Sequence, residues 1–517
     1  MSIVDMVAKH ARLIPDAPAL VEIKPVTGGR QEISWAQLDE RTNRLADSLI
    51  RMGVKKGDKV FLLGKNSLNW LEAYFAVLKT GAWVTPLNFR FTDDDIRFCA
   101  RTAEPVAFLF DEDFAERVHN LRKELTSIKY YSSIGGKGPK DMETMEDLIK
   151  KGSPSPAKVK LADEDECALY FTSGTTGAPK PVLIQQKSVM CSAISEATNH
   201  QLVQSDRFLM MPPMYHVAIG HMLGIVLVGG CSVLLTEQVS PQFIVETVAK
   251  EHVTVAFLLV PWATDLIETF DKKIIKIEDY NLSSWRLTHM GAQPIPPVLV
   301  KRFKAYFPRM LYDTNYGLSE SMGPGVVHLG MENERKVGAI GKPGLMWDAK
   351  IVNDSGEDVK QGDVGEVIVK GPGVMKEYYK NPELTAKTIR DGWLYTGDLG
   401  RVDEEGFIYL VDRKKDLIIS GGENIYPGEV EDVLLKHPKI HDVALIGVPH
   451  DRLVEVPAAI IDVLEGEVLT EEEVRAYCEQ NLPRYKQPKH IIFDTVPRNP
   501  TGKIEKPKLR EKYGKGK

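Results

Sequence analysis

Two features that often reveal a protein's class are scarce in this sequence. The five cysteines are scattered and include no Cys-x-x-Cys pair. This spacing argues against a zinc site and against a disulfide framework, and it favours free thiols in a reducing compartment. The net charge is −6, so the chain lacks the basic surplus that nucleic-acid-binding proteins carry. We therefore expect no nucleic-acid partner.

Long apolar runs are also missing. The longest, Met222–Leu235, contains three glycines and is too short to span a bilayer, so it predicts a buried helix end, a turn and a strand. Charged residues at Asp5, Lys9 and Arg12 interrupt Met1–Leu13, which excludes the apolar core of a signal peptide. We expect a cytoplasmic protein with no stable membrane insertion.

The motifs of several common enzyme mechanisms are absent as well. There is no Gly-x-Ser-x-Gly nucleophile elbow, no His-Glu-x-x-His motif and no Walker A loop. With 517 residues, of which 43% are hydrophobic and 27% charged, the composition is that of a soluble globular protein with more than one domain.

The first part of the chain alternates between strand-like and helical patterns. Helical periodicity, as in Trp35–Met52 and Asn66–Thr80, separates short apolar runs. These runs are Ala19–Ile23, Lys59–Leu63, Ala82–Pro86, Val106–Phe110, Cys167–Phe171, Phe208–Pro212, Cys231–Leu235, Val253–Val260 and Arg286–Met290. The alternation predicts an α/β fold with parallel strands and helices on both faces. Lys129–Ala162, rich in Gly, Pro, Lys and Ser, is expected to be a surface excursion.

The pattern changes twice towards the C-terminus. From Ala349 the strands become shorter and are separated by Gly-containing turns, which predicts a small β-barrel-like subdomain. After Asp416 the order helix, strand, strand, helix, strand predicts a compact α+β unit. We therefore predict an N-terminal domain at residues 1–411 with two α/β subdomains and the β-rich one. A hinge at 412–416 and a small, mobile C-terminal cap domain at 417–517 follow.

A Gly- and Thr-rich stretch follows the strand Cys167–Phe171 and is suited to phosphate. Glycines let the backbone approach a ligand, consecutive N–H groups form an anion site, and hydroxyls and a lysine add donors. The residues are Thr172, Ser173, Gly174, Thr175, Thr176, Gly177 and Lys180. An exposed polar turn is the alternative. A Walker loop is excluded because Lys180 lies between Pro179 and Pro181.

A second candidate stretch ends in a carboxylate. Its residues are Asp313, Thr314, Asn315, Tyr316, Gly317, Leu318, Ser319 and Glu320. Tyr316 can stack on a purine, Gly317 permits a tight turn, and Glu320 offers a hard oxygen ligand for Mg²⁺. A strand end with a solvated acid is the competing interpretation.

Three weaker signals lie at strand ends or turns. His216 follows a strand and an aromatic residue, and most such histidines only pack. The turn Gly291-Ala292-Gln293 follows another strand, where open α/β sheets bind ligands. Asp398, in a Thr-Gly-Asp turn, can accept hydrogen bonds from two ribose hydroxyls. Each would be weak evidence alone.

Taken in order, these motifs resemble the signatures of the adenylate-forming (ANL) superfamily, of the acyl-CoA synthetase or carboxylate–CoA ligase type. The first stretch is similar to TSGTTGxPKG, with Pro181 at the last glycine, and the second to YGxTE, with Ser319 at the threonine. Pro497–Lys503 is similar to PxxxxGK. The motifs that carry the resemblance run from Tyr170 to Lys503. The resemblance itself covers essentially the whole chain.

The resemblance implies roles for individual residues. ATP, Mg²⁺ and coenzyme A would be the cofactors and co-substrate, with Glu320 and Thr176 at the metal. Asp398 and Arg413 would contact ribose, and Lys415 would be the pivot of the hinge. Lys503 would reach both the carboxylate and the ATP phosphate. The turn Gly291-Ala292-Gln293 would form one wall of the adenine and acyl sites. His216 would gate the acyl pocket, and Gly421 and Gly422 would line the pantetheine tunnel.

The function expected from the resemblance is a two-step carboxylate–CoA ligase. An acyl-adenylate and pyrophosphate form first, and a thiol then displaces AMP. Val217 stands where amino-acid-activating relatives carry an aspartate, which argues against an amino-acid substrate. The expected pocket is apolar, with glycines that leave space for an aromatic, alicyclic or medium-chain acid. Its residues are Met214, His216, Val217, Ile219, Gly220, His289, Met290, Met322 and Pro324. His221 either lines this pocket or lies on a helix surface.

Three questions stay open at this stage. The enzyme could load a carrier-protein thiol instead of coenzyme A, or the chain could be a non-catalytic binding relative. The oligomeric state is also open, with a homodimer among the options.

Overall fold

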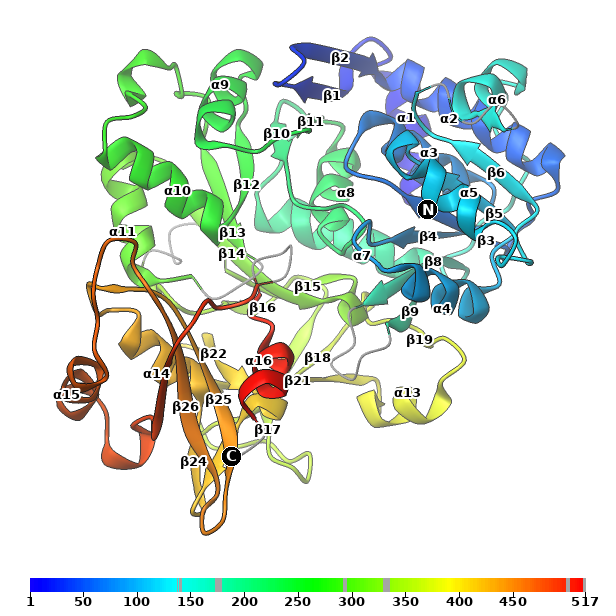
Figure 1. Ribbon diagram of the computed structural model, residues 1–517. Helices are drawn as coiled ribbons and strands as arrows, with labels where there is room; N and C mark the ends of the chain where they lie inside the picture. The colour runs from blue at the N-terminus through cyan, green and yellow to red at the C-terminus, as the bar shows by residue number, and fades with distance from the viewer. Residues whose placement is uncertain are drawn as a thin grey trace. The chain divides into compact units, whose positions relative to one another are not determined.

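The computed structural model describes residues 1–136, 138, 142–172, 179–291, 295–328, 335–498 and 503–514 (Figure 1). The described chain divides into two compact units. The first unit comprises Met1–Ala349 and Val369–Leu394, and the second comprises Lys350–Ile368 and Tyr395–Lys517.

A nine-stranded sheet forms one half of the first unit. Six neighbouring strands, from β14 to β1 in sheet order, pair in parallel, while β2, β15 and β16 join antiparallel at the edges. In sheet order the strands are β16 (Lys342–Pro343), β15 (Gly323–His328), β14 (Leu311–Leu318), β13 (Leu287–Gly291), β12 (Val255–Leu259), β10 (Arg207–Met210), β11 (Cys231–Leu235), β1 (Pro18–Lys24) and β2 (Gly29–Ser34). Every residue of β11, β12 and β13 is buried, as expected for strands covered on both faces.

An eight-stranded sheet forms the other half. In order its strands are β19 (Glu377–Tyr378), β9 (Lys180–Gln185), β8 (Glu166–Thr172), β4 (Trp83–Leu87), β3 (Lys59–Leu63), β5 (Ala107–Phe110), β6 (Tyr130–Ser133) and β7 (Glu143–Thr144). Strands β8 and β9 form an antiparallel hairpin, and β19 pairs antiparallel with β9. The hairpin places the predicted phosphate loop between two adjacent strands.

The prediction of a surface excursion at Lys129–Ala162 is wrong for the strands and the helix that this segment contains, while residues 152–162 form no helix or strand. The segment adds β6 and β7 to the eight-stranded sheet and then forms helix α6 (Met145–Lys151). Its short, polar strands show no alternation that would mark them in the sequence. Strand β6 is stabilised by parallel pairing with β5, and β7 by parallel pairing with β6, which are tertiary contacts.

Helices begin and end where local chemistry favours it. The Ser34 side chain accepts a hydrogen bond at the start of α2 (Trp35–Met52), and Gly53 ends that helix with φ of 108°. The other long helices of this unit are α1 (Ile3–Leu13), α3 (Leu68–Lys79), α4 (Asp93–Ala103), α9 (Pro241–Glu251), α10 (Val260–Asp271) and α11 (Pro297–Tyr306). Shorter ones are α5 (Ala115–Leu121) and α13 (Pro382–Thr388).

Two buried helices connect the sheets of the first unit. Helix α7 (Gln186–Asn199) follows β9 and packs against α8 (Ile219–Val228) and against β15 of the nine-stranded sheet (Figure 1). A Cβ on Gly224 of α8 would lie 2.9 Å from the Cβ of Glu196, so the close approach of these helices requires glycine there. The region Met222–Leu235 forms a helix end, a turn and a strand, as predicted.

Two five-stranded sheets hold the strands of the second unit, although β20, in the first of these sheets, belongs to the first unit. One contains β17 (Asp348–Val352), β18 (Gly365–Lys370), β21 (Trp393–Val402), β20 (Ile389–Arg390) and β22 (Ile408–Arg413). The other contains β24 (Glu423–Ile425), β23 (Ile418–Ser420), β26 (Val454–Val463), β25 (Ile440–His450) and β27 (His490–Phe493). Helices α14 (Pro427–Leu434), α15 (Glu471–Asn481) and α16 (Lys506–Tyr513) accompany them.

The predicted α+β order after Asp416 is present in the second unit. The predicted domain boundary and the hinge at 412–416 stay predictions, although 414–416 form a short 3-10 turn between two sheets. All five cysteines are buried and free. No helix among the described residues combines the length and apolar character needed to cross a bilayer.

Candidate functional site

The hairpin of β8 and β9 holds both ends of the predicted phosphate loop. Thr172 ends β8 and pairs with Lys180, which begins β9. The residues between them that were predicted to bind phosphate lie outside the described residues: Ser173, Gly174, Thr175, Thr176 and Gly177. A loop that joins antiparallel strands differs from a Walker loop, which leads from a strand into a helix.

Tyr378 links two predicted site residues from distant parts of the sequence. Its hydroxyl donates a 2.6 Å hydrogen bond to Oε1 of Glu320. Lys180 Nζ lies 5.7 Å from the centre of the same ring. Burial, with Glu320 next, raises the pKa of Tyr378, so the phenol stays protonated as a donor. Tyr378 could not be recognised from the sequence pattern, because the strand on which it lies, β19, has only two residues.

Strand β14 and the turn after it carry the second predicted stretch. Asp313, Thr314, Asn315, Tyr316 and Gly317 lie on the strand, and a 3-10 turn holds Ser319 and Glu320. A Cβ on Gly317 would lie 2.0 Å from the carbonyl oxygen of Gly323, so only glycine fits beside β15.

The side chain of Asp313 points into the protein interior. It is fully buried, and its two oxygens contact His289 Nδ1 at 2.7 Å and His200 Nδ1 at 2.8 Å. Any contact of Asp313 with a nucleotide is therefore left to its backbone.

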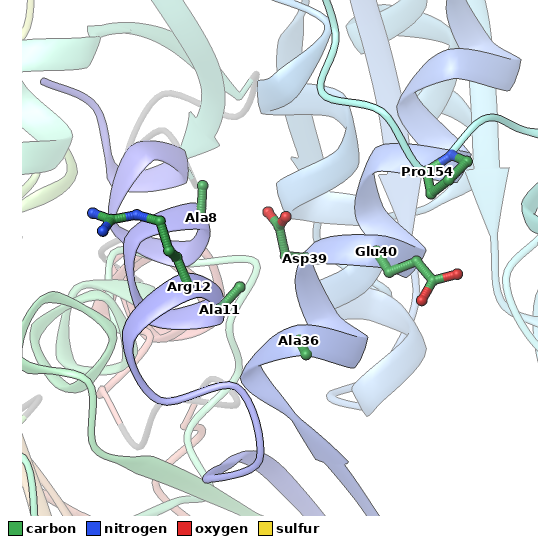
Figure 2. Close-up of a pocket in the computed structure, with 7 residues that line it drawn as sticks. All are labelled: Ala8, Ala11, Arg12, Ala36, Asp39, Glu40 and Pro154. Carbon is green, nitrogen blue, oxygen red and sulfur yellow. The ribbon is translucent and has the colours of Figure 1, made fainter.

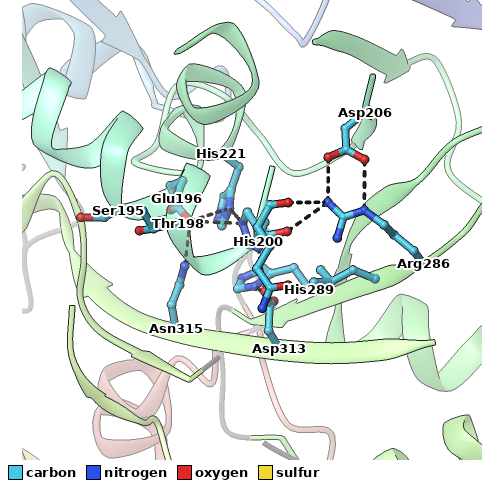
Figure 3. Close-up of polar contacts among 12 residues, drawn as sticks. Ser195, Glu196, Thr198, His200, Asp206, His221, Arg286, His289, Asp313 and Asn315 are labelled. Carbon is cyan, nitrogen blue, oxygen red and sulfur yellow. Dashed lines mark hydrogen bonds and ion pairs between the residues drawn. The ribbon is translucent and has the colours of Figure 1, made fainter. Parts of the chain in front are cut away.

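A buried network of imidazoles and carboxylates surrounds Asp313 (Figure 3). His200 Nε2 lies 2.9 Å from His221 Nδ1 and 3.2 Å from Glu196 Oε2. Asn315 donates to the same Glu196 oxygen at 2.9 Å. The interpretation of His221 as a helix-surface residue is wrong, because it is 5% exposed. Sequence reasoning missed Glu196 and His200, although their i, i+4 spacing at the end of a helix was visible.

The two histidines that contact Asp313 differ in pKa. Burial opposes charge on both rings, but Asp313 and Glu196 outweigh it and raise the pKa of His200 to about 9. For His289 burial dominates and lowers the pKa to about 4. Burial alone would raise the pKa of the Glu196 and Asp313 carboxyls. The neighbouring histidines outweigh burial and hold the pKa of both carboxyls below their usual range.

An ion pair holds the chain just after α7. Arg286 donates to Asp206 at 2.7 Å and also to the backbone oxygens of His200 and Gln201 (Figure 3). The last carbonyls of this helix end are therefore paired with a cation, which is favourable at a helix C-terminus.

The remaining predicted residues of the first unit lie near strand ends. Gly291 is the last residue of β13, and Ala292 and Gln293 lie outside the described residues. His216 is half-buried in the turn before α8, with its ring 5.5 Å from that of Tyr215.

The second unit brings together two predicted ribose contacts. Asp398 and Arg413 face each other across β21 and β22, with 3.3 Å between Arg413 Nε and Asp398 Oδ1. Lys415 is exposed in the 3-10 turn that follows.

Two further predicted segments of this unit are turns or surface positions. Gly421 and Gly422 form the turn between β23 and β24 with φ of 60° and 90°, a conformation that favours glycine. Lys503 is exposed and precedes Ile504, which bridges to Arg498.

A surface hollow of about 500 Å³ lies between α1 and α2 (Figure 2). Three alanines are among its lining residues, and the Asp39 carboxylate there is already bound by Lys79 at 2.7 Å. None of the predicted site residues lines this hollow, and we assign it no function.

Comparison with known proteins identifies relatives over the whole length. The family model described as AMP-binding enzyme matches residues 7–379, and the AMP-binding enzyme C-terminal domain matches residues 429–503. Long-chain-fatty-acid–CoA ligase FadD13 of Mycobacterium tuberculosis is 31% identical over 509 residues, 98% of each chain. Feruloyl-CoA synthase of Amycolatopsis sp is 33% identical over 510 residues, again 98% of each chain.

Solved structures agree with the sequence relatives. o-Succinylbenzoate CoA synthetase (MenE) from Bacillus subtilis, in complex with its acyl-adenylate intermediate, is 27% identical with a TM-score of 0.85. The alignment covers 98% of this chain and 97% of that one. The same enzyme with ATP and a magnesium ion is 28% identical with a TM-score of 0.83, covering 96% and 98%.

Proposed function

This chain belongs to the AMP-binding enzyme family and is an acid–thiol ligase of the acyl-CoA synthetase type, and we propose that it couples a carboxylic acid to coenzyme A in two steps. In the first, the acid attacks the α-phosphate of ATP to give an acyl-adenylate and pyrophosphate. In the second, the thiol of coenzyme A displaces AMP from the acyl carbon. The observation that carries the proposal is the match to acyl-CoA ligases along 98% of the chain.

Neither step needs a covalent enzyme nucleophile. The enzyme has to position the reactants and offset the charge that develops on phosphate. We assign phosphate binding to the stretch from Thr172 to Lys180, whose sequence offers glycines, hydroxyls and a lysine. Tyr378 supports this site, because its ring lies beside Lys180 and its hydroxyl orients Glu320.

The residues at the proposed magnesium site fit a hard cation. Glu320 accepts the Tyr378 hydroxyl on Oε1 and is only partly buried, so its carboxylate can also face a ligand. Glu320 and Thr176 would hold Mg²⁺, which offsets phosphate charge when bound.

The second unit would supply the ribose contacts and a catalytic lysine. Asp398 accepts the ribose hydroxyls, and Arg413, 3.3 Å away, keeps its carboxylate in place. Lys503 stabilises the charge that builds during adenylation, and rotation about Lys415 would then remove it. Gly421 and Gly422 would line the passage for pantetheine.

We propose an aromatic, alicyclic or medium-chain acid as the substrate. The relatives described above are named for long-chain fatty acids, ferulate and succinylbenzoate, which are all larger than acetate. Met214 and Met290 from the expected pocket are buried and apolar, and His216 before α8 is half-buried, as a gate would be.

The test is a panel of carboxylic acids with pyrophosphate release, AMP and acyl-CoA measured separately. We expect cyclic or medium-chain acids to give AMP and a CoA thioester. Preference for acetate over all of them would refute the substrate class. Thioester formation only on a carrier protein would favour an enzyme that loads a carrier-protein thiol. Absence of any acid-dependent pyrophosphate release would favour a non-catalytic binding protein.

A further inference from the structure

Three potential ligand atoms converge in the interior of the first unit (Figure 3). They are Oε2 of Glu196, Nε2 of His200 and Nδ1 of His221, and they form a triangle with sides of 2.9, 3.1 and 3.2 Å. The three side chains are between 0% and 6% exposed. None of the three residues has a part in the reaction steps proposed above, and only His221 was considered from the sequence, as a lining residue of the acid pocket.

Hydrogen bonds satisfy this triangle only in part. The Glu196 oxygen carries no proton when ionised, so the two nitrogens supply all the donors. If both nitrogens are protonated, two N–H groups face each other across the 2.9 Å side. If only one is protonated, the lone pair of the other nitrogen faces the Glu196 oxygen. In every arrangement one of the three contacts between these atoms is unfavourable. In a buried site such a contact costs more than it would in water.

A cation bound to the three atoms removes that conflict, because each atom can then offer it a lone pair. From this geometry we propose that Glu196, His200 and His221 form a divalent-cation site, with Zn²⁺ as the ion that fits best. Two imidazoles and one carboxylate are a ligand set that Zn²⁺ accepts. Ligands about 2.0–2.1 Å from a tetrahedral Zn²⁺ lie about 3.4 Å apart, so the observed triangle needs to widen by only a few tenths of an ångström.

The surroundings have the form of a supporting shell. His200 bonds through Nδ1 to Asp313, which leaves Nε2 for the ion. Ligating histidines typically bond a carboxylate in this way. Asn315 donates to the ligating oxygen of Glu196 and orients it.

A buried hydroxyl lies beside the same carboxylate. Ser192 Oγ has no hydrogen-bond partner in the described part of the chain. A Cβ on Gly220 would lie 2.5 Å from this hydroxyl and 3.5 Å from Glu196 Oε1, so the two groups are neighbours. Ser192 is 1% exposed, so a buried hydroxyl that lacks a partner among the described residues lies near Glu196.

A second group of potential ligands, His200, His289 and Asp313, does not converge in this way. Each histidine there contacts a different oxygen of Asp313, at 2.8 and 2.7 Å, so ordinary hydrogen bonds satisfy both. We therefore place the ion at Glu196 and assign Asp313 to its support.

The ion would tie α7, α8 and β14 together. Helix α8 follows the turn with His216, and β14 leads into Glu320. The ion would thus fix the walls of the proposed acid site without touching the reacting atoms. The cysteine spacing that argued against zinc does not bear on this site, because its ligands are histidine and glutamate.

The test uses the full chain, free of any affinity tag and stripped with a chelator. It is titrated with Zn²⁺ or Co²⁺ alone, without ATP, and bound metal is measured by elemental analysis and by the absorption of Co²⁺. We expect about one ion per chain, with affinity reduced at least tenfold in Glu196→Gln and in His221→Gln. These two substitutions leave the contact between His200 and Asp313 in place.

A buried histidine of the same unit serves as the matched control. His10, 6% exposed and bonded to the backbone of Leu227, lies outside the cluster, so His10→Asn should bind metal like the unaltered chain. Failure of the unaltered chain to bind either ion, or equal binding by it and both cluster variants, would overturn the proposal. The readout is metal bound, so its outcome is independent of the ligase proposal.

Discussion

At the scale of single residues, Tyr378 is the least expected part of the proposed nucleotide site. It lies far along the sequence from both residues it contacts, on a strand of two residues. Its hydroxyl holds Glu320 while its ring lies beside Lys180. This one side chain therefore couples the phosphate hairpin to the proposed magnesium ligand.

Tyr378→Phe should weaken the proposed magnesium site. The ring and its packing stay, but Glu320 loses a donor, and hydrogen bonds to charged groups contribute about 1.5–3 kcal/mol. If the full effect falls on metal binding, the Mg²⁺ concentration for half-maximal pyrophosphate release should rise by about tenfold or more. A magnesium titration at saturating ATP measures it.

The neighbouring Tyr379→Phe is the control for that substitution. Tyr379 packs its ring edge-on against Trp83 and has no contact with Glu320 among the hydrogen bonds of the described residues. It should leave the magnesium dependence unchanged. An equal shift in both variants would contradict the role of Tyr378.

At the scale of elements, three helices of the first unit meet at one arginine. Arg41 of α2 donates to Glu72 of α3 at 2.9 Å and also to Glu146 of α6. Glu72 is fully buried, and its side chain depends on Arg41 for a positive partner. Burial raises the pKa of Glu72, and Arg41 opposes that shift.

Arg41→Met should destabilise the protein by about 3 kcal/mol, because it leaves a buried carboxylate without a partner. A group whose pKa is raised on folding binds its proton more readily when folded, so its contribution to stability falls as pH rises through that pKa. Removal of Arg41 raises the pKa of Glu72 further. The loss should therefore be smallest at mildly acidic pH and grow towards alkaline pH, as measured by urea unfolding.

Two further variants separate this effect from general damage. Adding Glu72→Gln to Arg41→Met should flatten the pH dependence and restore part of the stability. Arg51→Met removes an arginine on the same helix whose partner, Asp47, is more exposed than Glu72. It should lower the free energy of unfolding by about 1 kcal/mol or less. A pH-independent loss in Arg41→Met would show that the charge of Glu72 is not its cause.

Elements with strong local signals could be predicted from the sequence. The helix Trp35–Met52 was predicted with its observed bounds, because its periodicity, serine cap and terminal glycine agree. Strand β6 was missed, because it is stabilised by pairing with β5 rather than by its own pattern. The motifs gave candidate residues in order, but the network around Glu196 and His200 depends on helix packing that no local pattern encodes.

At the scale of the whole molecule, the proposed reaction draws on both units. Thr172, Lys180 and Glu320 belong to the first, while Asp398 and Lys503 belong to the second. In the proposed reaction, adenylation therefore uses residues of both units. Thioester formation requires Lys503 to give way to coenzyme A, if the hinge at 412–416 acts as proposed.

Lys503→Ala tests this division of labour. The lysine stabilises charge only while the acyl-adenylate forms, so we expect adenylation to fall by about 10²-fold or more. Thioester formation from a supplied acyl-adenylate should persist, because no phosphate charge builds in that step. Lys508→Ala is the matched control, since Lys508 is an exposed lysine nearby that pairs only with Glu505 among the ion pairs of the described residues. Equal loss of both half-reactions in Lys503→Ala would mean that one fixed arrangement of the units serves both steps, which would remove the reason for a hinge.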